Sequence, residues 1–176
     1  PTVVVTMGGF TKDKPLDPAR RPELYDLIID GLSRVDDEGV EIVAQTLPPF
    51  PWLLGGQWHH NLFVEPADTI AFSEKSGYRL CLDISHTKLA ANHCKASFRD
   101  WTELLAPHTA HLHIVDAAGV DGEGLQVGEG EIDFDEIGAV LRKHAPDASF
   151  IPEIWQGHKN MGEGFWTALE RLEGHI

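Results

Sequence analysis

The sequence has few cysteines, few basic residues and no long hydrophobic segment, and each shortage excludes a class of protein. Only Cys81 and Cys94 are present among 176 residues, and their spacing matches no metal or redox motif, so we expect reduced thiols in a cytoplasmic protein. Lys and Arg number 14 against 28 Asp and Glu, and the formal net charge of −14 disfavours a nucleic acid partner. No apolar run approaches the roughly 20 residues that cross a bilayer, and the first residues lack the features of a signal peptide. We therefore expect a soluble globular protein without a membrane or nucleic acid partner.

Five short apolar segments are typical of buried β-strands. Each is largely apolar without clean alternation and ends at polar or turn-forming residues, as strands covered on both faces do. The predicted strands are 2–7, 40–45, 78–83, 110–116 and 149–154. Amphipathic segments lie between them, and 17–39 and 134–147 have the spacing and the end signals of helices. This alternation predicts an α/β protein with a parallel sheet.

A doubly wound sheet and a (β/α) barrel share this alternation, so the spacing leaves both open. The first predicted strand is followed by "MGGF", which is too short to be a phosphate-binding fingerprint. Five units in 176 residues fall short of the eight units and roughly 250 residues of a complete barrel. If the chain is a barrel, about three strands are missing.

Four of the five predicted strands carry one polar group near the end. The four residues are Gln45, Asp83, His113 and Glu153. The carboxyl ends of parallel strands are where sites are built, so we expect these side chains to converge. Two carboxylates, an imidazole and an amide oxygen suit a divalent cation such as Mn²⁺, Zn²⁺, Co²⁺ or Mg²⁺, and the lack of thiolates argues against a structural zinc site.

Each of these residues has an ordinary structural explanation when it is taken alone. Asp83 could cap the following turn, His113 could be a hydrogen-bonded core histidine, and Glu153 could pair with a Lys or Arg. The recurrence of one polar group at the same place in four units favours a site.

Two loops add candidate residues. His86 lies three residues past Asp83, where it can reach the same pocket. Trp155, His158 and Lys159 follow Glu153 and are able to stack on or hydrogen-bond a polyol. Ordinary polar surface is the alternative for both loops.

The segment 48–63 combines prolines, aromatic residues and paired histidines. Trp52, His59 and His60 lie in it, and we predict a stiff aromatic lid over the site. The alternative is a hydrophobic loop that docks on a partner subunit.

Several of these segments together resemble a known family. "LCLDISH", "HLHIVDAAGVDGEGLQVGEGEIDF" and "FIPEIWQG" resemble the xylose isomerase-like barrel superfamily, which includes sugar-phosphate isomerases and epimerases and, more distantly, metal-dependent apurinic-site endonucleases. The resemblance covers most of the chain from about residue 40 onward. "LPPFPWLLGGQWHHNLF" and "DISHTKLAANH" are similar to the isomerase-like module attached to some sialic-acid-type synthases of bacterial surface-sugar pathways.

The resemblance implies a fold and a set of roles. Residues 1–176 would be the C-terminal portion of a (β/α)8 TIM barrel and supply about the last five βα units. Asp83, His113 and Glu153 would be metal ligands, and His86 would contact the substrate. The glycine-rich segment 119–134 would be a mobile loop that closes over the substrate, with Asp133 or Asp135 capping the next helix.

One position departs from the family pattern. The family's epimerases place a glutamate where this chain has Gln45, and that glutamate binds the metal and works with the last glutamate as an acid/base pair. An amide can bind a cation through its oxygen but cannot take a proton at neutral pH. Epimerisation by a Gln45 and Glu153 pair is therefore disfavoured.

These observations support three hypotheses of different classes. The leading one is a divalent-metal-dependent sugar or sugar phosphate isomerase or epimerase that acts through an enediolate, with Glu153 and His86 as catalytic residues. The second is a non-catalytic or regulatory sugar-binding module of a sialic-acid-type synthase. The third, a metal-dependent endonuclease, is weakened by the acidic charge. The expected partners are a small sugar, the missing barrel strands or a fused synthase domain, and a second copy of the chain.

Overall fold

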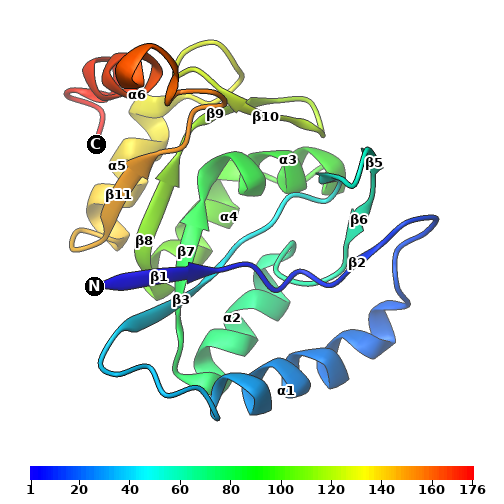
Figure 1. Cartoon of the computed structure of the whole chain (residues 1–176). Coiled ribbons are helices and arrows are strands. Elements are labelled where there is room, and N and C mark those ends of the chain that lie inside the picture. The colour runs from blue at the N-terminus through cyan, green and yellow to red at the C-terminus, as the bar shows by residue number, and fades with distance from the viewer.

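A computed structural model of the protein describes residues 1–176 and contains one parallel sheet of five strands in the order β1-β3-β7-β8-β11 (Figure 1). The strands are β1 (Thr2–Val5), β3 (Glu41–Gln45), β7 (Arg79–Asp83), β8 (Thr109–Ile114) and β11 (Ser149–Pro152). All five predicted strands are confirmed, and their bounds lie within two residues of the predicted ones.

Six helices and several short strands connect the main strands. The helices are α1 (Arg21–Leu32), α2 (Pro66–Ser76), α3 (Ile84–Cys94), α4 (Phe98–Leu105), α5 (Phe134–His144) and α6 (Lys159–Leu172), with 3₁₀ turns at Pro18–Arg20 and Ala106–His108. The short strands are β2 (Phe10–Thr11), β4 (Trp52–Leu53), β5 (Gly56–Gln57), β6 (His59–His60), β9 (Asp116–Ala118) and β10 (Gly122–Leu125). None of the helices combines the length and the apolarity needed to span a bilayer.

Local signals explain where the helices begin and end. The side chain of Asp83 accepts from the backbone N–H of His86 at 3.0 Å at the start of α3, and Asp133 does the same for Glu136 at 3.0 Å at the start of α5. The helix predicted over 17–39 is shorter than expected, because α1 ends at Leu32 and the next residue, Ser33, donates its hydroxyl to the Asp30 carbonyl at 2.8 Å.

Most of the core lies between the helices and one face of the sheet. Apolar residues of the strands pack there with residues of the helices, among them Leu80, Leu82, Leu112, Ile114, Phe72, Leu89, Ile137 and Leu141. The opposite face holds a small cluster of Val43, Cys81 and Ala110. The strands follow chain order across the sheet and the order never reverses, whereas a doubly wound sheet reverses at a switch point. The architecture is therefore that of a partial (β/α)8 barrel.

The sheet is open, with β1 and β11 at its edges. Apolar side chains on both edge strands are exposed, including Val3 on β1 and Phe150 and Ile151 on β11. In a closed barrel such edges are paired with neighbouring strands.

The segment predicted as a mobile loop is instead held in place by a buried carboxylate. β9 and β10 form an antiparallel hairpin, and Asp116 at the start of β9 is fully buried. Its side chain accepts backbone N–H groups of Ala117, Gly128, Gly130 and Ile132 at 2.8–3.1 Å. Gly130 has to be a glycine here, because a Cβ atom would collide with this carboxylate.

We predict that Asp116→Asn destabilises the protein. The amide directs an NH₂ group at backbone donors that the carboxylate now satisfies, so the free energy of unfolding should fall by about 2–4 kcal/mol in urea denaturation. The exposed Asp147 is the control, and Asp147→Asn should change it by less than about 0.5 kcal/mol. Equal stability of the two variants would contradict this role for Asp116.

Candidate metal centre

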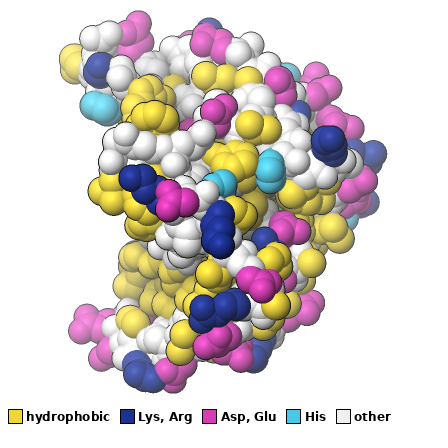
Figure 2. Space-filling model, turned by 90° about the vertical axis from the view of Figure 1, so that its right-hand side faces the viewer, with side chains coloured by type: hydrophobic (Ala, Val, Ile, Leu, Met, Phe, Trp, Pro, Cys, Tyr) yellow, Lys and Arg dark blue, Asp and Glu magenta, His cyan; other side chains and the backbone are white.

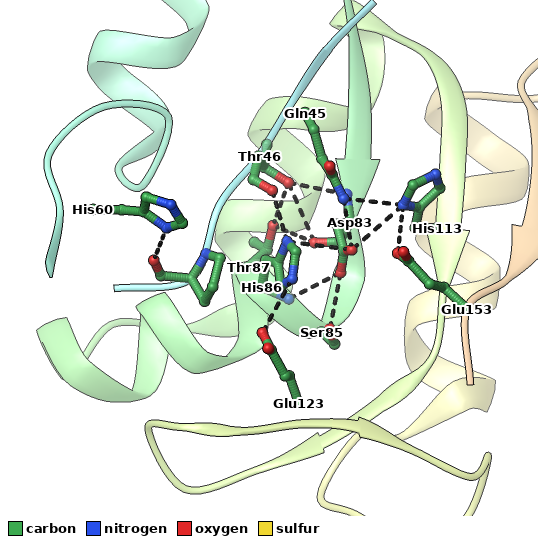
Figure 3. A network of polar contacts seen from close by, with 11 residues as sticks. Gln45, Thr46, His60, Asp83, Ser85, His86, Thr87, His113, Glu123 and Glu153 are labelled. Carbon is green, nitrogen blue, oxygen red and sulfur yellow. Dashed lines mark hydrogen bonds and ion pairs between the residues drawn. The ribbon is translucent and has the colours of Figure 1, made fainter. Parts of the chain in front are cut away.

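The register of the parallel strands brings the four polar strand ends together. Asp83 is paired with His113, and Gln45 is paired with Cys81, two residues before Asp83. Glu153 directly follows β11, the neighbour of β8. Ligand atoms of Asp83, His113 and Glu153 all lie within 4.8 Å of one another, and the three residues form a group that could hold a metal ion (Figure 3).

Gln45 and the triad form a network of short polar contacts. His113 Nδ1 lies 2.6 Å from Glu153 Oε2 and 3.6 Å from Asp83 Oδ2. Gln45 Nε2 lies 3.1 Å from Asp83 Oδ2 and 3.0 Å from His113 Nδ1. Asp83, Gln45 and His113 are buried, whereas the side chain of Glu153 is 51% exposed. The centre is therefore approached from the Glu153 side.

One close contact of this network cannot be a hydrogen bond in the metal-free protein. His113 Nδ1 must donate to Glu153, so the Gln45 amide nitrogen beside it places one donor against another. Rotating the amide by half a turn would instead place its oxygen against the Asp83 carboxylate. A cation between these groups removes the conflict, because it binds the amide oxygen, both carboxylates and a deprotonated Nδ1. The donor set thus fits a divalent cation.

Charge compensation explains how the buried carboxylate is tolerated. Burial disfavours the Asp83 anion, but His86 and His113 together hold the pKa of Asp83 well below its usual range. Burial likewise disfavours protonated His113, yet its bonds to Asp83, Cys81 and Glu153 raise the pKa of His113 to about 12. Without a metal, the imidazolium of His113 supplies the positive charge that the carboxylates require.

His86 lies beside the triad and is held by both ring nitrogens. Its Nδ1 lies 2.9 Å from the Thr46 carbonyl and 3.2 Å from Asp83 Oδ2, and its Nε2 lies 3.3 Å from Glu123 Oε2 (Figure 3). Burial opposes its charge, but Asp83 and Glu123 outweigh this and raise the pKa of His86 to about 9. The side chain of His86 therefore reaches the same pocket as Asp83, as the sequence predicted.

Glu123 is a residue of this site that sequence analysis missed. It lies on β10 between two glycines whose neighbours leave no room for a side chain, because a Cβ at Gly122 would lie 2.6 Å from the Ala118 carbonyl oxygen and one at Gly124 3.0 Å from the Trp155 Cβ. The hairpin is thereby packed so that Glu123 reaches His86. The only signal in the sequence is an acid between two glycines.

The three predicted lid residues lie in different environments. His60 Nδ1 donates to the Pro48 carbonyl at 2.9 Å and the ring lies near His86, and burial lowers the pKa of His60. His59 packs its ring edge-on against Phe50, with ring centroids 5.4 Å apart. Trp52 is 70% exposed on the β4–β5 hairpin.

Other contacts show how this segment lies. β6 pairs with β2, and Gln57 donates to Asp121 of the β9–β10 hairpin at 3.1 Å, so segment 48–63 and that hairpin are in contact. Figure 2 shows histidine side chains reaching the surface in the middle of this side of the molecule, among hydrophobic ones.

The residues after Glu153 lie beside the centre rather than in it. Trp155 is 73% exposed, His158 is exposed, and Lys159 Nζ donates to Gln156 at 2.8 Å at the start of α6. Their substrate-binding roles, like that of Trp52, stay predictions.

The fold and the site together define a partial TIM barrel with polar groups at the carboxyl ends of its strands. A family model described as xylose isomerase-like TIM barrel matches residues 1–172, and the chain belongs to this family.

Solved structures agree on the fold. A D-tagatose 3-epimerase-like protein is 22% identical, with a TM-score of 0.67 over 98% of this chain and 63% of its own. A D-psicose 3-epimerase, solved in the presence of D-fructose, is 18% identical, with a TM-score of 0.61 over 92% of this chain and 57% of its own. The probable 3-DHS dehydratase AsbF from Bacillus anthracis is 16% identical, with a TM-score of 0.66 over 98% of this chain and 64% of its own.

The chain thus spans 57% to 64% of the length of these proteins, and at these identities the likeness shows the fold alone. No curated protein sequence matches the chain.

We predict that His86 makes stability depend on pH. Its folded pKa of about 9 exceeds the usual 6.5, so the protonated ring stabilises the fold below pH 6.5, and this contribution is lost as the pH rises toward 9. The free energy of unfolding of EDTA-treated protein should fall as the pH rises from 6.5 to 9. The fall should be up to about 3 kcal/mol larger in the wild type than in His86→Gln. Urea denaturation at each pH measures this. His158→Gln is the control and should follow the wild type; identical curves for wild type and His86→Gln would refute the assignment.

We predict that Gln45→Glu has opposite effects with and without metal. A third carboxylate beside Asp83 and Glu153 should lower the free energy of unfolding of the metal-free protein by about 1–3 kcal/mol. The same charge should tighten Mn²⁺ binding about tenfold, as measured by isothermal titration calorimetry. Gln156→Glu, on the exposed loop after Glu153, is the control and should do neither. Weaker Mn²⁺ binding by Gln45→Glu would mean that position 45 does not face the ion.

Proposed function

We propose that this chain forms part of a divalent-metal-dependent isomerase or epimerase that acts on a sugar or sugar phosphate. The observation that carries the proposal is the convergence of Asp83, His113 and Glu153 within 4.8 Å, in a network where a cation would remove the donor-to-donor contact of Gln45 with His113. The sugar 3-epimerases among the structures of similar fold support the same reaction class. The oxygen-rich donor set with one imidazole is compatible with Mn²⁺, Co²⁺, Mg²⁺ or Zn²⁺.

Each residue has a role that follows from its position. Asp83, His113, Glu153 and the amide oxygen of Gln45 would bind the cation. A cation held by these residues would supply Lewis-acid stabilisation of the negative charge of an enediolate. Glu153 is the residue best placed to take the proton from carbon, because its carboxylate is half exposed at the open side of the centre. His86 directs Nε2 toward Glu123 and thereby positions its carboxylate, which is partly exposed and offers an acceptor to sugar hydroxyls.

Gln45 limits the mechanism. Its amide cannot deliver a proton, so an epimerisation would need a water molecule or another side chain on the face opposite Glu153. An isomerisation, in which one base moves a proton between neighbouring carbons, is compatible with Glu153 alone.

A second candidate function is a non-catalytic or regulatory sugar-binding module of a surface-sugar synthase. The amide at position 45 favours it, since it removes one acid/base group and keeps the other ligands. The exposed apolar side chains of β1 and β11 support a partner at the sheet edges: further barrel strands, a fused synthase domain or a second copy of the chain. An endonuclease is disfavoured by the net charge of −14. Two free cysteines are compatible with a cytoplasmic location.

Solvent deuterium incorporation separates the two candidates. The Mn²⁺-loaded protein is incubated in D₂O with D-tagatose, D-psicose, D-fructose and their phosphates, and carbon-bound deuterium is followed by NMR. We expect incorporation that requires the metal and falls about 10²- to 10⁴-fold in Glu153→Gln, the range for loss of a general base.

Glu170→Gln, on the exposed side of α6, is the control and should retain the activity. Sugar binding with neither deuterium incorporation nor conversion to another sugar would overturn the enzyme proposal and support the binding module.

A further inference from the structure

A groove of about 520 Å³ lies beside the candidate metal centre, between β10, the segment 154–160 and α6. Two of its lining residues connect it to the centre. Glu123 lines the groove and reaches His86 at 3.3 Å, and Ile154 is the residue after Glu153. A ligand at the centre could therefore extend into the groove.

The walls of the groove carry the chemistry that binds sugar rings. Trp155 offers an indole that is 73% exposed, against which the C–H face of a sugar can pack. The amides of Gln126, Gln156 and Asn160 line the same space. Gln126 is held by the Gly164 carbonyl and the Val127 N–H, whereas the NH₂ group of Gln156 and the amide oxygen of Asn160 make no hydrogen bond within the protein and can bond hydroxyl groups. An exposed aromatic ring with several amides is suited to an uncharged polyol.

Close backbone packing fixes the position of this tryptophan. The N–H of Trp155 donates to the Gly124 carbonyl at 2.9 Å, and Gly124, at φ +77°, lets the two segments approach. Seven non-glycine residues of the chain have a left-handed backbone conformation. Three of them lie within six residues of Trp155 in the sequence: Gln156, Asn160 and Met161. Such strained conformations persist only where the surrounding structure imposes them, and they cluster at functional sites.

The charges of the groove argue against a phosphate. Three carboxylates line it, Glu123, Glu129 and Glu163, against the two cations Lys159 and Arg171. Arg171 is engaged by the Val127 carbonyl at 2.6 Å and by Glu129 at 3.3 Å. A phosphate would meet a net negative lining on a chain whose formal charge is −14.

We propose that this groove binds an uncharged glycosyl unit linked to the sugar at the metal centre, so that the substrate is larger than a monosaccharide. The identity of the sugar at the metal centre rests on the proposed function. The binding of a second sugar unit in the groove is inferred from the residues that line it.

Disaccharides that end in fructose test the proposal. Turanose, lactulose and isomaltulose carry a glycosyl unit on three different oxygens of fructose, and their affinities for the Mn²⁺-loaded protein are compared by calorimetry with those of D-fructose and fructose 6-phosphate. We expect at least one disaccharide to bind about tenfold more tightly than fructose, a gain that corresponds to about 1.4 kcal/mol. In Trp155→Ala, the ratio of the two affinities should fall to about one.

Trp166→Ala is the matched control, because Trp166 is 64% exposed on α6 and does not line this groove. It should keep the wild-type ratio. The inference is overturned if no disaccharide binds better than fructose, if both tryptophan variants lose the preference equally, or if fructose 6-phosphate binds best. A preference that depends on Trp155 but survives EDTA would support the groove while refuting the metal-dependent function.

Discussion

The parallel register between β7 and β8 is the constraint on which the rest of the structure depends. It places the buried carboxylate of Asp83 directly opposite His113, at the end of the sheet where α3 begins. A buried carboxylate without partners is costly, and polar contacts offset this cost for Asp83. The Ser85 hydroxyl and the His86 N–H donate to it at 2.9 and 3.0 Å, and the Gln45 amide nitrogen lies 3.1 Å away. The helix cap and the candidate ligand are therefore the same side chain.

The loops around the centre depend on a second buried carboxylate. By collecting four backbone N–H groups, Asp116 folds a glycine-rich segment back on itself, so that Glu123 reaches His86 and Gly124 contacts Trp155. The two carboxylates lie on or after neighbouring strands and act differently. Asp83 is surrounded by ionisable groups, whereas the bonds to Asp116 come from the backbone, which makes Asp116 a structural residue.

Much of this architecture could be predicted from the sequence, because runs of β-branched residues and strand-end polar groups are local signals. The five strands and the meeting of Gln45, Asp83, His113 and Glu153 follow from those signals and from the common direction of parallel strands. The pairing of β2 with β6 and the Gln57–Asp121 contact could not be predicted, because they join segments far apart in the chain that share no periodicity. The β9–β10 hairpin is local, but its segment is rich in glycine and acidic residues and lacks the apolar pattern of a strand. The contact of Glu123 with His86 depends on that hairpin and was missed for the same reason.

If the strand ends of this partial barrel hold one divalent cation, crystals of the protein grown with MnCl₂ will reveal it in an anomalous difference map at the manganese absorption edge. We expect a single strong peak in contact with Asp83, His113 and Glu153, with the Gln45 amide rotated so that its oxygen faces the ion. A map without a peak among these residues, in a crystal whose protein shows the network in Figure 3 intact, would contradict this expectation.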